Sequence, residues 1–464
     1  MAIDPFTTAT GIAKAIAAGE TTALGVTEAA LARIDARNPQ LNAFTAVTRE
    51  RALAKARAID DMRTAGQPLG PLAGVPFAVK NLFDVAGLPT LAGSKINRDR
   101  VPAKADATLI TRLESAGAVL VGALNMGEYA YDFTGENVHD GHARNPHNIE
   151  HMTGGSSSGS GGAVGGGLVP LALGSDTNGS IRVPASFCGL YGLKPTYGRL
   201  SRARSFPFVA SLDHVGPLAR SVRDLAVAYD AMQGPDPNDP VCAGRPVEPT
   251  VPWLERRAAG GLRIAVAGGY FTRGAGPEAL EAVARIAKAL GATREVELPE
   301  PGRARAAAYV ITAAEGAALH LDRLRTRAAE YDPAVRDRLL AGAMIPASLV
   351  VKAQKLRRWY RERVLELFQN VDAILAPATP FPAPRIGQQT MQLDGTEVPL
   401  RPNIGIFTQP ISCIGLPVVA VPVPLQPLPI GVQIIAAPWR EDVALGLAHA
   451  LEGAGIVAAP RPPE

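Results

Sequence analysis

The sequence contains few residues of several kinds, and each shortage excludes a class of protein. Three cysteines stand far apart among 464 residues, at Cys188, Cys242 and Cys413, so a disulfide-stapled secreted domain is not expected. The net charge is only +4 and the basic residues are dispersed, which argues against a nucleic-acid-binding module. No apolar run reaches about 18 residues, the length that a membrane-spanning helix requires. These shortages predict a cytoplasmic protein that binds neither membranes nor nucleic acid directly.

The remaining composition indicates one large folded domain. Hydrophobic residues make up 47% of the chain, enough to fill a core at this length. We expect a single domain over residues 1–464, in which the Pro-rich stretch 234–252 crosses the surface without dividing the chain. Residues 1–7, MAIDPFT, have neither the charged nor the apolar segment of a signal peptide, and we interpret them as a remnant of cloning.

Hydrophobic periodicity places helices and strands alternately along the chain. The pattern predicts helices over residues 10–18, 26–38, 49–65, 106–116, 277–290, 306–329 and 347–368. It predicts strands over residues 77–79, 118–124 and 262–267, and a final strand pair among the Pro-rich loops 377–385 and 422–429. Strands that alternate with helices indicate an α/β fold, a sheet covered by helices on both faces.

The most informative stretch is a run rich in glycine and serine, residues 153–196. It reads TGGSSSGSGGAVGGGLVPLALGSDTNGSIRVPASFCGLYGLKPT. A flexible linker would not carry apolar segments such as LVPLALG, and a phosphate-binding loop would need a lysine directly behind its glycines. The composition instead favours a hydrolytic serine site. In such a site, glycines let backbone amides approach an oxyanion, and serines supply a nucleophile and a proton relay.

A serine nucleophile needs a base, and the sequence offers histidine and lysine. Four histidines precede the serine run: His139, His142, His147 and His151. Their polar segment, broken by glycine and proline, is typical of a solvated loop, and their spacing matches no standard zinc site. Lys80 follows the apolar, strand-like segment 77–79, where partial desolvation favours a neutral amine. Lys80 is therefore the alternative base, although a lysine that only reaches to the surface also fits this position.

Several segments together resemble the amidase signature family. They span nearly the whole chain in order: PLAGVPFAVKN around Lys80, the GGSSSG run, GSDTNGSIRVPASFCGLYGLKPT, DAILAPATP, TQPISCIGLP and LPIGVQIIAAPW. The resemblance implies an α/β fold with a large mixed β-sheet and a catalytic Ser-Ser-Lys triad. Residue by residue, it assigns Lys80 as the base, Ser156 behind a cis peptide bond as the relay, and Ser180 as the nucleophile.

The implied roles suit amide hydrolysis. An amide carbon is a poor electrophile, so Ser180 would attack as an activated hydroxyl and form an acyl-enzyme. Ser156 would pass the proton to Lys80 and later return it to the leaving nitrogen. Four consecutive backbone amides are the expected oxyanion hole: Thr177, Asn178, Gly179 and Ser180. Because two serines and a lysine supply every proton transfer, no cofactor or metal is expected.

One residue departs from the family pattern. Where the family usually has glycine, this chain has Asn178, in the sequence DTNGS. Asparagine tolerates a left-handed backbone better than other non-glycine residues, so we expect the loop to keep its shape. The side chain would either narrow the acyl pocket or bind a polar substrate, and the second alternative suits a small, polar acyl group. Asp176 and Arg182 are expected to pair and to support the turn.

Finer similarities within the family bear on the substrate. The segments NLFDVAGLPTLAGSKINR and AYDAMQGPDPNDP, together with Asn178, resemble members that release ammonia from a small carboxylated ureide, 1-carboxybiuret. A buried arginine is the natural partner for a carboxylate. The resemblance places Tyr309 and Arg338 at the substrate, with Arg336 as a rival, although both arginines could instead lie exposed on a helix.

Other functions stay open at this point. The runner-up is the glutamine-hydrolysing component of a tRNA amidotransferase, followed by a general small-molecule amidase with a hydrophobic channel. A non-enzyme alternative, a silent ureide-binding subunit, conflicts with the intact set of Lys80, Ser156 and Ser180. The resemblance also implies a homodimeric core and a small helical accessory subunit.

Overall fold

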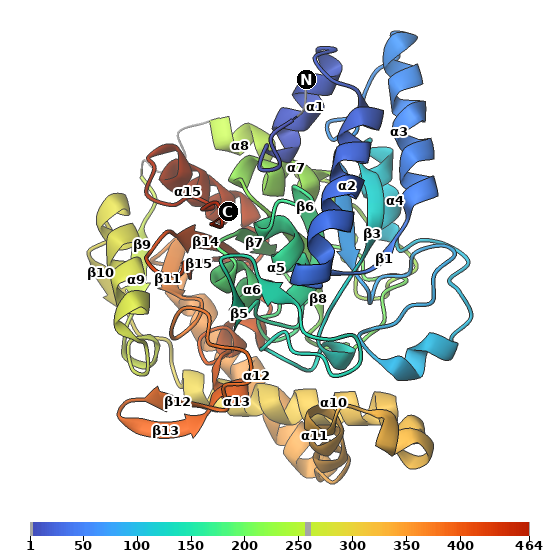
Figure 1. Ribbon diagram of the computed structural model, residues 1–464. Helices are drawn as coiled ribbons and strands as arrows, with labels where there is room; N and C mark the ends of the chain where they lie inside the picture. Colours follow the sequence, from blue (N-terminus) through green and yellow to red (C-terminus); the bar gives the residue numbers. More distant parts are fainter. Residues whose placement is uncertain (1–2, 256–260, 464) are drawn as a thin grey trace.

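A mixed sheet of eleven strands forms the centre of the molecule in the computed structural model, which describes residues 3–255 and 261–463 (Figure 1). From one edge to the other its strands are β1 (Phe44–Val47), β3 (Val119–Leu124), β2 (Pro76–Lys80), β6 (Leu171–Asp176), β8 (His214–Ala219), β7 (Tyr191–Lys194), β14 (Val418–Val423), β15 (Ile430–Ala436), β11 (Ala373–Pro377), β9 (Ile264–Ala267) and β10 (Arg294–Val296). β2 pairs in parallel with β3 and β6, whereas β14 and β15 are antiparallel. The central strands are buried along their whole length, which explains their nearly continuous apolar sequences. The predicted large mixed sheet is confirmed.

Helices pack on both faces of this sheet. In chain order they are α1 (Ala9–Ala17), α2 (Ala23–Leu41), α3 (Arg49–Thr64), α4 (Thr108–Ser115), α5 (Ser158–Gly165), α6 (Arg182–Phe187), α7 (Val222–Met232), α8 (Val251–Glu255), α9 (Pro277–Leu290), α10 (Pro301–Arg327), α11 (Pro333–Ala343), α12 (Ala347–Leu367), α13 (Leu400–Asn403), α14 (Gln409–Ser412) and α15 (Glu441–Gly453). Short 3₁₀ helices are η1 (Lys95–Asp99), η2 (Glu128–Ala130), η3 (Gly269–Phe271) and η4 (Ala328–Glu330). Figure 1 shows α10, α11 and α13 gathered beneath the sheet.

Most predicted elements form where the periodicity places them. The helix predicted over 277–290 is α9 with the same bounds, and α10 begins at Pro301, five residues before the predicted start at residue 306, because proline fits a first helical turn. The prediction missed β1 and two small hairpins, whose strands have at most five residues: β4 (Arg144–Asn145), β5 (Asn148–Met152), β12 (Thr390–Leu393) and β13 (Thr396–Pro399). Elements this short carry too few residues for a periodic signal.

The Pro-rich stretch 234–252 runs without strand, and without helix until α8 begins at Val251. Asp236 holds it in place by accepting hydrogen bonds from the hydroxyls of Ser201 and Thr108, both at 2.6 Å. Asp239 pairs with Arg202. These contacts tie the stretch to the sheet domain on its N-terminal side. A single domain over the whole chain stays a prediction.

The helices and the cysteines of the structure bear on membrane association and on disulfide formation, respectively. Within the two described ranges, no single helix is long and apolar enough to cross a membrane; α11 and α12 reach that length only together, and a bend of 98° separates them. The three cysteines are free thiols, two of them buried.

The topology places chemical groups at the carboxyl ends of two neighbouring parallel strands. β2 ends at Lys80 and β6 ends at Asp176, and Val79 stands opposite Leu173 in the ladder between them. The loop that follows β6 carries Ser180. Ligands of α/β proteins bind at the carboxyl ends of the strands, so this edge is the place to look for a site.

Candidate active site

Lys80 is buried at the end of β2 and contacts two serine hydroxyls. Its Nζ lies 2.6 Å from Ser156 Oγ and 2.9 Å from Ser175 Oγ. Burial of the fully enclosed side chain lowers the pKa of Lys80 to about 7, against the opposing attraction of Asp176 and more distant carboxylates. The amine is therefore uncharged in a large fraction of molecules near neutral pH and can accept a proton. The alternative of a lysine that only reaches to the surface is wrong.

Ser156 is held by a tightly packed, glycine-rich segment. The peptide bond between Gly155 and Ser156 is cis, as the family resemblance implied. A Cβ at Gly155 would lie 2.8 Å from a carboxylate oxygen of Asp132, and a Cβ at Gly159 on α5 would lie 2.4 Å from a backbone oxygen. No larger residue fits either position without displacing its neighbours. The glycines thus let the backbone pack closely around Ser156, and a flexible linker is excluded.

The turn between β6 and α6 is fixed by a buried ion pair. The carboxylate of Asp176 accepts hydrogen bonds from Nε and Nη2 of Arg182, both at 2.9 Å, and from the amide of Ile181 at 3.2 Å. Both side chains are fully buried, and the Arg182 charge holds the pKa of Asp176 far below its usual range in spite of that burial. The supporting role that the sequence suggested for this pair is confirmed. A buried, fully hydrogen-bonded pair is a rigid base for the residues between its members.

This turn presents Ser180 and a row of unused backbone donors. Gly179 has φ +145°, and a Cβ there would lie 2.2 Å from Thr408 Oγ1, so the position requires glycine. Within the described residues, none of the amides from residue 177 to residue 180 donates to an internal acceptor, and Ser180 Oγ has no hydrogen-bond partner. Free amides beside a free hydroxyl are the arrangement that an oxyanion hole and its nucleophile require.

The backbone of Asn178 does not have the left-handed conformation that we expected, and its side chain makes a hydrogen bond to another element. Its φ is negative, and the left-handed conformation falls on Gly179 instead, so the predicted reason for asparagine is wrong. Its Nδ2 donates to Thr312 Oγ1 on α10 at 3.0 Å, while its Oδ1 is buried and has no partner. A buried acceptor without a donor is unusual in a folded protein and directs attention to what a ligand could supply.

Ser180 and Asn178 line a pocket, here named the reaction pocket, whose cavity volume is about 20 Å³. Its other lining residues are Ala130, Tyr131, Asp132, Phe133, Thr177, Phe208, Tyr309, Thr312, Arg338, Pro402 and Gln409. They come from the end of η2 and the segment after it, the turn after β6, the segment before β8, and helices α10, α11, α13 and α14. A cavity of this volume holds about one water molecule, so the walls of the pocket lie close together.

Tyr309 and Arg338, the two residues predicted to contact the substrate, both line this pocket. Arg338 stacks its guanidinium 3.9 Å from the centre of the Tyr131 ring, and it donates to the backbone oxygens of Ala334 and Tyr131. No carboxylate of the described chain pairs with it. Tyr309 also lines the pocket, with its hydroxyl donated to Pro402 O at 2.6 Å. Arg336, the rival, instead pairs with its neighbour Asp337 and does not line the pocket.

The carboxylate of Asp132, by contrast, is already occupied. One of its oxygens lies 2.5 Å from Nη1 of Arg401, and it also accepts from the amide of Gly135. Arg401 in turn reaches Glu136 at 2.8 Å. Among the described lining residues Asp132 is the only acidic one, so the pocket contains a free cationic group and no free anionic group.

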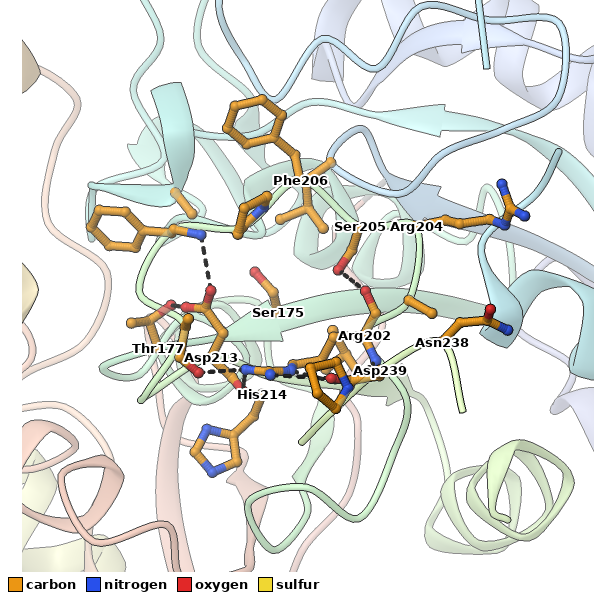
Figure 2. A pocket seen from close by; sticks show the side chains of 18 residues that line it. Ser175, Thr177, Arg202, Arg204, Ser205, Phe206, Asp213, His214, Asn238 and Asp239 are labelled. Carbon is orange, nitrogen blue, oxygen red and sulfur yellow. Dashed lines mark hydrogen bonds and ion pairs between the residues drawn. The ribbon is translucent and has the colours of Figure 1, made fainter. Parts of the chain in front are cut away.

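A second cavity, of about 230 Å³, is lined by Ser175, one of the two hydroxyl partners of Lys80 (Figure 2). Ser175 and Thr177 line it together with Asp213, which accepts a hydrogen bond from Thr177 Oγ1 at 2.6 Å. Burial raises the pKa of Asp213. Ala130, Thr177 and Phe208 line both cavities, so they form part of the wall between them. Asp213 therefore fixes one side of the turn after β6 from within the second cavity.

The sequence did not predict several residues that the structure places at the site. Ser175, Thr312 and Gln409 were not predicted; Ser175 could have been found from its place one residue before Asp176 on a strand parallel to that of Lys80. The other two become neighbours only through the folded chain.

The histidine segment also differs from its interpretation as a solvated loop. The side chain of His139 is 5% exposed and contacts the buried Glu128 at 2.8 Å. None of the four histidines lines the reaction pocket. Over the described ranges, no group of three or more His, Cys, Asp or Glu side chains is arranged to hold a metal ion.

Comparisons with known proteins place this geometry in a family. The amidase family model matches residues 25–445. The chain is 54% identical to AtzE, a subunit of the 1-carboxybiuret hydrolase of Pseudomonas sp. (strain ADP), over 96% of this chain and 98% of that protein. It is 40% identical to the GatA-type subunit of the glutamyl-tRNA(Gln) amidotransferase of Azotobacter vinelandii, over 94% and 95% of the two chains.

Solved structures agree with this placement. A chain from a protein complex described as vestigial, and as revealing the evolutionary origins of an s-triazine catabolic enzyme, superimposes with a TM-score of 0.97 at 53% identity, over 98% of this chain and 100% of that chain. A bacterial aryl acylamidase of the amidase signature enzymes superimposes with a TM-score of 0.88 at 27% identity, over 97% and 96%. The same fold thus serves substrates as different as a ureide and an aryl amide, so the substrate has to be argued from the pocket.

Proposed function

This chain belongs to the amidase family, and from that premise we propose that it hydrolyses 1-carboxybiuret, a small carboxylated ureide, through an acyl-enzyme formed on Ser180. Ser180 attacks the terminal amide carbon while its proton passes through Ser156 to the neutral amine of Lys80. The amides of residues 177–180 receive the oxyanion. The proton then returns to the leaving nitrogen, and ammonia departs.

Water completes the cycle by the same relay. It attacks the acyl carbon, gives its proton to Lys80 through Ser156, and releases Ser180. The overall reaction consumes one water and yields ammonia and a urea that carries a carboxylate on each nitrogen. No other reactant is needed, because the lysine and the two serines supply and accept each proton in turn.

The observation that carries the substrate assignment is the unpaired guanidinium of Arg338 in the same pocket as Ser180. An arginine that is stacked on Tyr131 and tied to backbone oxygens is held in one orientation. It stays cationic although burial lowers the pKa of Arg338. Such a group suits bidentate binding of a carboxylate at the far end of the substrate.

The same pocket argues against the two enzymatic alternatives. Glutamine would bring an α-ammonium group as well as a carboxylate, and the lining offers no free acid to pair with it because Asp132 is paired with Arg401. An aryl or fatty amide would need an apolar channel, whereas Asn178, Thr312 and Arg338 all line the pocket. A pocket wall that contains a charged group and polar atoms without hydrogen-bond partners disfavours an apolar acyl group.

The experiment that tests this proposal is ammonia release on a panel of amides. The panel contains 1-carboxybiuret, made in situ by opening the ring of cyanuric acid, together with biuret, glutamine and an aryl amide. We expect the fastest turnover with 1-carboxybiuret, weaker or absent turnover of biuret because it lacks the carboxylate, no turnover of glutamine or the aryl amide, and loss of all turnover in Ser180→Ala. Turnover of glutamine or of the aryl amide in place of 1-carboxybiuret would contradict the substrate assignment, and an unreactive panel together with ureide binding would favour the silent binding protein.

We also propose that the chain works in an assembly with a second copy of itself and a small helical subunit. Two relatives support this: AtzE is one subunit of its hydrolase, and the solved s-triazine neighbour belongs to a protein complex. Exposed apolar side chains gather on α10, α11, α12 and the loop between the last two: Leu319, Leu321, Leu340, Met344, Leu349, Val351 and Trp359. Light scattering of the purified chain tests the homodimer, and a monomer at micromolar concentration would contradict it.

A further inference from the structure

The ureide and glutamine have the same length between their reacting groups. In both molecules three atoms separate the amide carbon that is attacked from the carboxylate carbon. Contacts at the two ends of the substrate, to Ser180 and to Arg338, therefore cannot distinguish the ureide from glutamine. The middle of the chain differs, because the ureide presents N–H, C=O and N–H where glutamine presents two methylene groups and its α-carbon.

The wall of the reaction pocket contains polar groups with unused hydrogen-bonding capacity. Asn178 Oδ1 is a buried acceptor with no donor. Thr312 Oγ1 accepts from Asn178 Nδ2, and within the described residues its own hydroxyl proton is donated to no one. Gln409 accepts from Arg305 Nε through Oε1 at 2.8 Å, which leaves its NH₂ group without an acceptor in the same ranges. One acceptor and two donors are thus left over.

These groups line the same pocket as Ser180 and Arg338. Thr312 and Tyr309 are three residues apart on α10, hence on the same side of that helix, and both line the pocket with Ser180 and Arg338. Gln409 is the first residue of α14 and is 1% exposed. The polar groups are fixed by burial and by their partners on other elements, so they are positioned before any ligand arrives.

We propose that Asn178, Thr312 and Gln409 determine specificity by hydrogen bonding to the internal ureide group, which makes the pocket select a ureide over an aliphatic chain of equal length. This inference rests on the proposed function, since it concerns the middle of the same substrate. Asn178 Oδ1 accepts from a ureide N–H, and the hydroxyl of Thr312 or the amide of Gln409 donates to the internal carbonyl. The proton-transfer residues are unaffected.

The expected discrimination follows from what an aliphatic substrate leaves unpaired. A methylene chain would bury Asn178 Oδ1 without supplying a donor, and sites built for hydrogen bonding reject such analogues strongly. The asparagine in place of the usual glycine is then explained by what it binds and not by its backbone conformation. Its amide orientation is fixed by Thr312, which makes Thr312 a positioning residue as well as a contact.

The test compares 1-carboxybiuret with glutaramate, which has the same length and the same terminal amide and carboxylate but three methylene groups between them. In Asn178→Ala we expect kcat/KM for 1-carboxybiuret to fall about 10- to 100-fold, and kcat/KM for glutaramate to change less than about threefold. The quantity compared between variants is the ratio of kcat/KM for 1-carboxybiuret to kcat/KM for glutaramate. In this comparison the different intrinsic reactivities of the two substrates cancel. Thr312→Val, which keeps the shape of the side chain, should lower the ratio about 5- to 20-fold and covers the case that the alanine variant fails to fold.

Two controls separate the outcomes. Asn148→Ala removes an exposed asparagine on β5 and should leave both substrates unchanged. Arg338→Lys should weaken both substrates alike, since both carry the carboxylate. Equal losses on both substrates in Asn178→Ala and Thr312→Val would overturn the inference and leave the proposed function intact. Wild-type turnover of glutaramate or glutamine without turnover of 1-carboxybiuret would instead overturn the proposed function.

Discussion

Two lysines at the ends of two strands of the sheet are alike in burial and different in their partners. Lys80 ends β2 and Lys194 ends β7, and each is 0% exposed. Burial lowers the pKa of each to about 7. Lys80 contacts the hydroxyls of Ser156 and Ser175, whereas Lys194 donates to the backbone oxygens of Leu416 and Pro195.

The difference shows that a lowered pKa alone does not identify a catalytic base. A backbone oxygen can only accept a hydrogen bond, so Lys194 acts there as a donor that satisfies two buried carbonyls. A serine hydroxyl can donate and accept, so Lys80 can take a proton through Ser156 and give it back. We infer a proton-transfer role for Lys80 and a structural role for Lys194.

The largest expected effect comes from removing the amine of Lys80. In Lys80→Met we expect kcat to fall by about 10⁴-fold or more, because Ser180 loses its base while the apolar volume of the side chain is kept. The thermal midpoint should change little, since no buried carbonyl loses a donor. Initial rates of ammonia release and a thermal melt of the same preparation measure both quantities. A Lys80→Met variant that keeps a tenth of the wild-type rate would contradict the role of Lys80 as the base, and with it the contrast between Lys80 and Lys194.

A smaller effect is expected at the second hydroxyl partner. Ser175→Ala should lower kcat about 10- to 100-fold, because Lys80 keeps Ser156 but is less firmly oriented. The midpoint of the pH profile should also move, which a merely structural change would not cause. Ser175→Thr restores a hydroxyl and should recover much of the rate. No change in either rate or midpoint would show that Ser175 is only a packing residue.

The smallest effect on activity is expected at Lys194. In Lys194→Met the kcat of the folded protein should stay within about threefold of wild type, while two buried carbonyls lose their donor at about 1–3 kcal/mol each. For a chain of this size that corresponds to a fall in Tm of roughly 2–6 °C. A large loss of kcat with an unchanged Tm would contradict the structural role.

The sheet and the main helices could be predicted because their signals are local and repeated. The buried strand Val119–Leu124 is continuously apolar, and α9 shows an apolar face bounded by Pro277 and Gly291, so each is readable from its own residues. The hairpin of β12 and β13 was missed because four-residue strands carry no such repeat. The strand order of the sheet depends on contacts across the whole chain and was not predicted.

The site was predictable to the extent that it follows motifs. Lys80, Ser156 and the turn at Ser180 stand in recognisable segments, and the structure brings the first two into contact. The hydrogen bond from Asn178 to Thr312 joins residues 134 positions apart, and no periodicity or spacing announces it. The negative φ of Asn178 likewise depends on how the turn packs against Thr408.

The pH dependence of kcat/KM, recorded for the wild type and for Lys194→Met, tests the central claim most directly. The neutral form of Lys80 is the active base, so with its pKa lowered to about 7 the rate should rise about tenfold per pH unit below that value and level off above about pH 8. The account predicts the same rise and the same midpoint in both proteins. A flat profile between about pH 6 and about pH 9, or a rise that disappears in Lys194→Met, would show that Lys80 is not the titrating base.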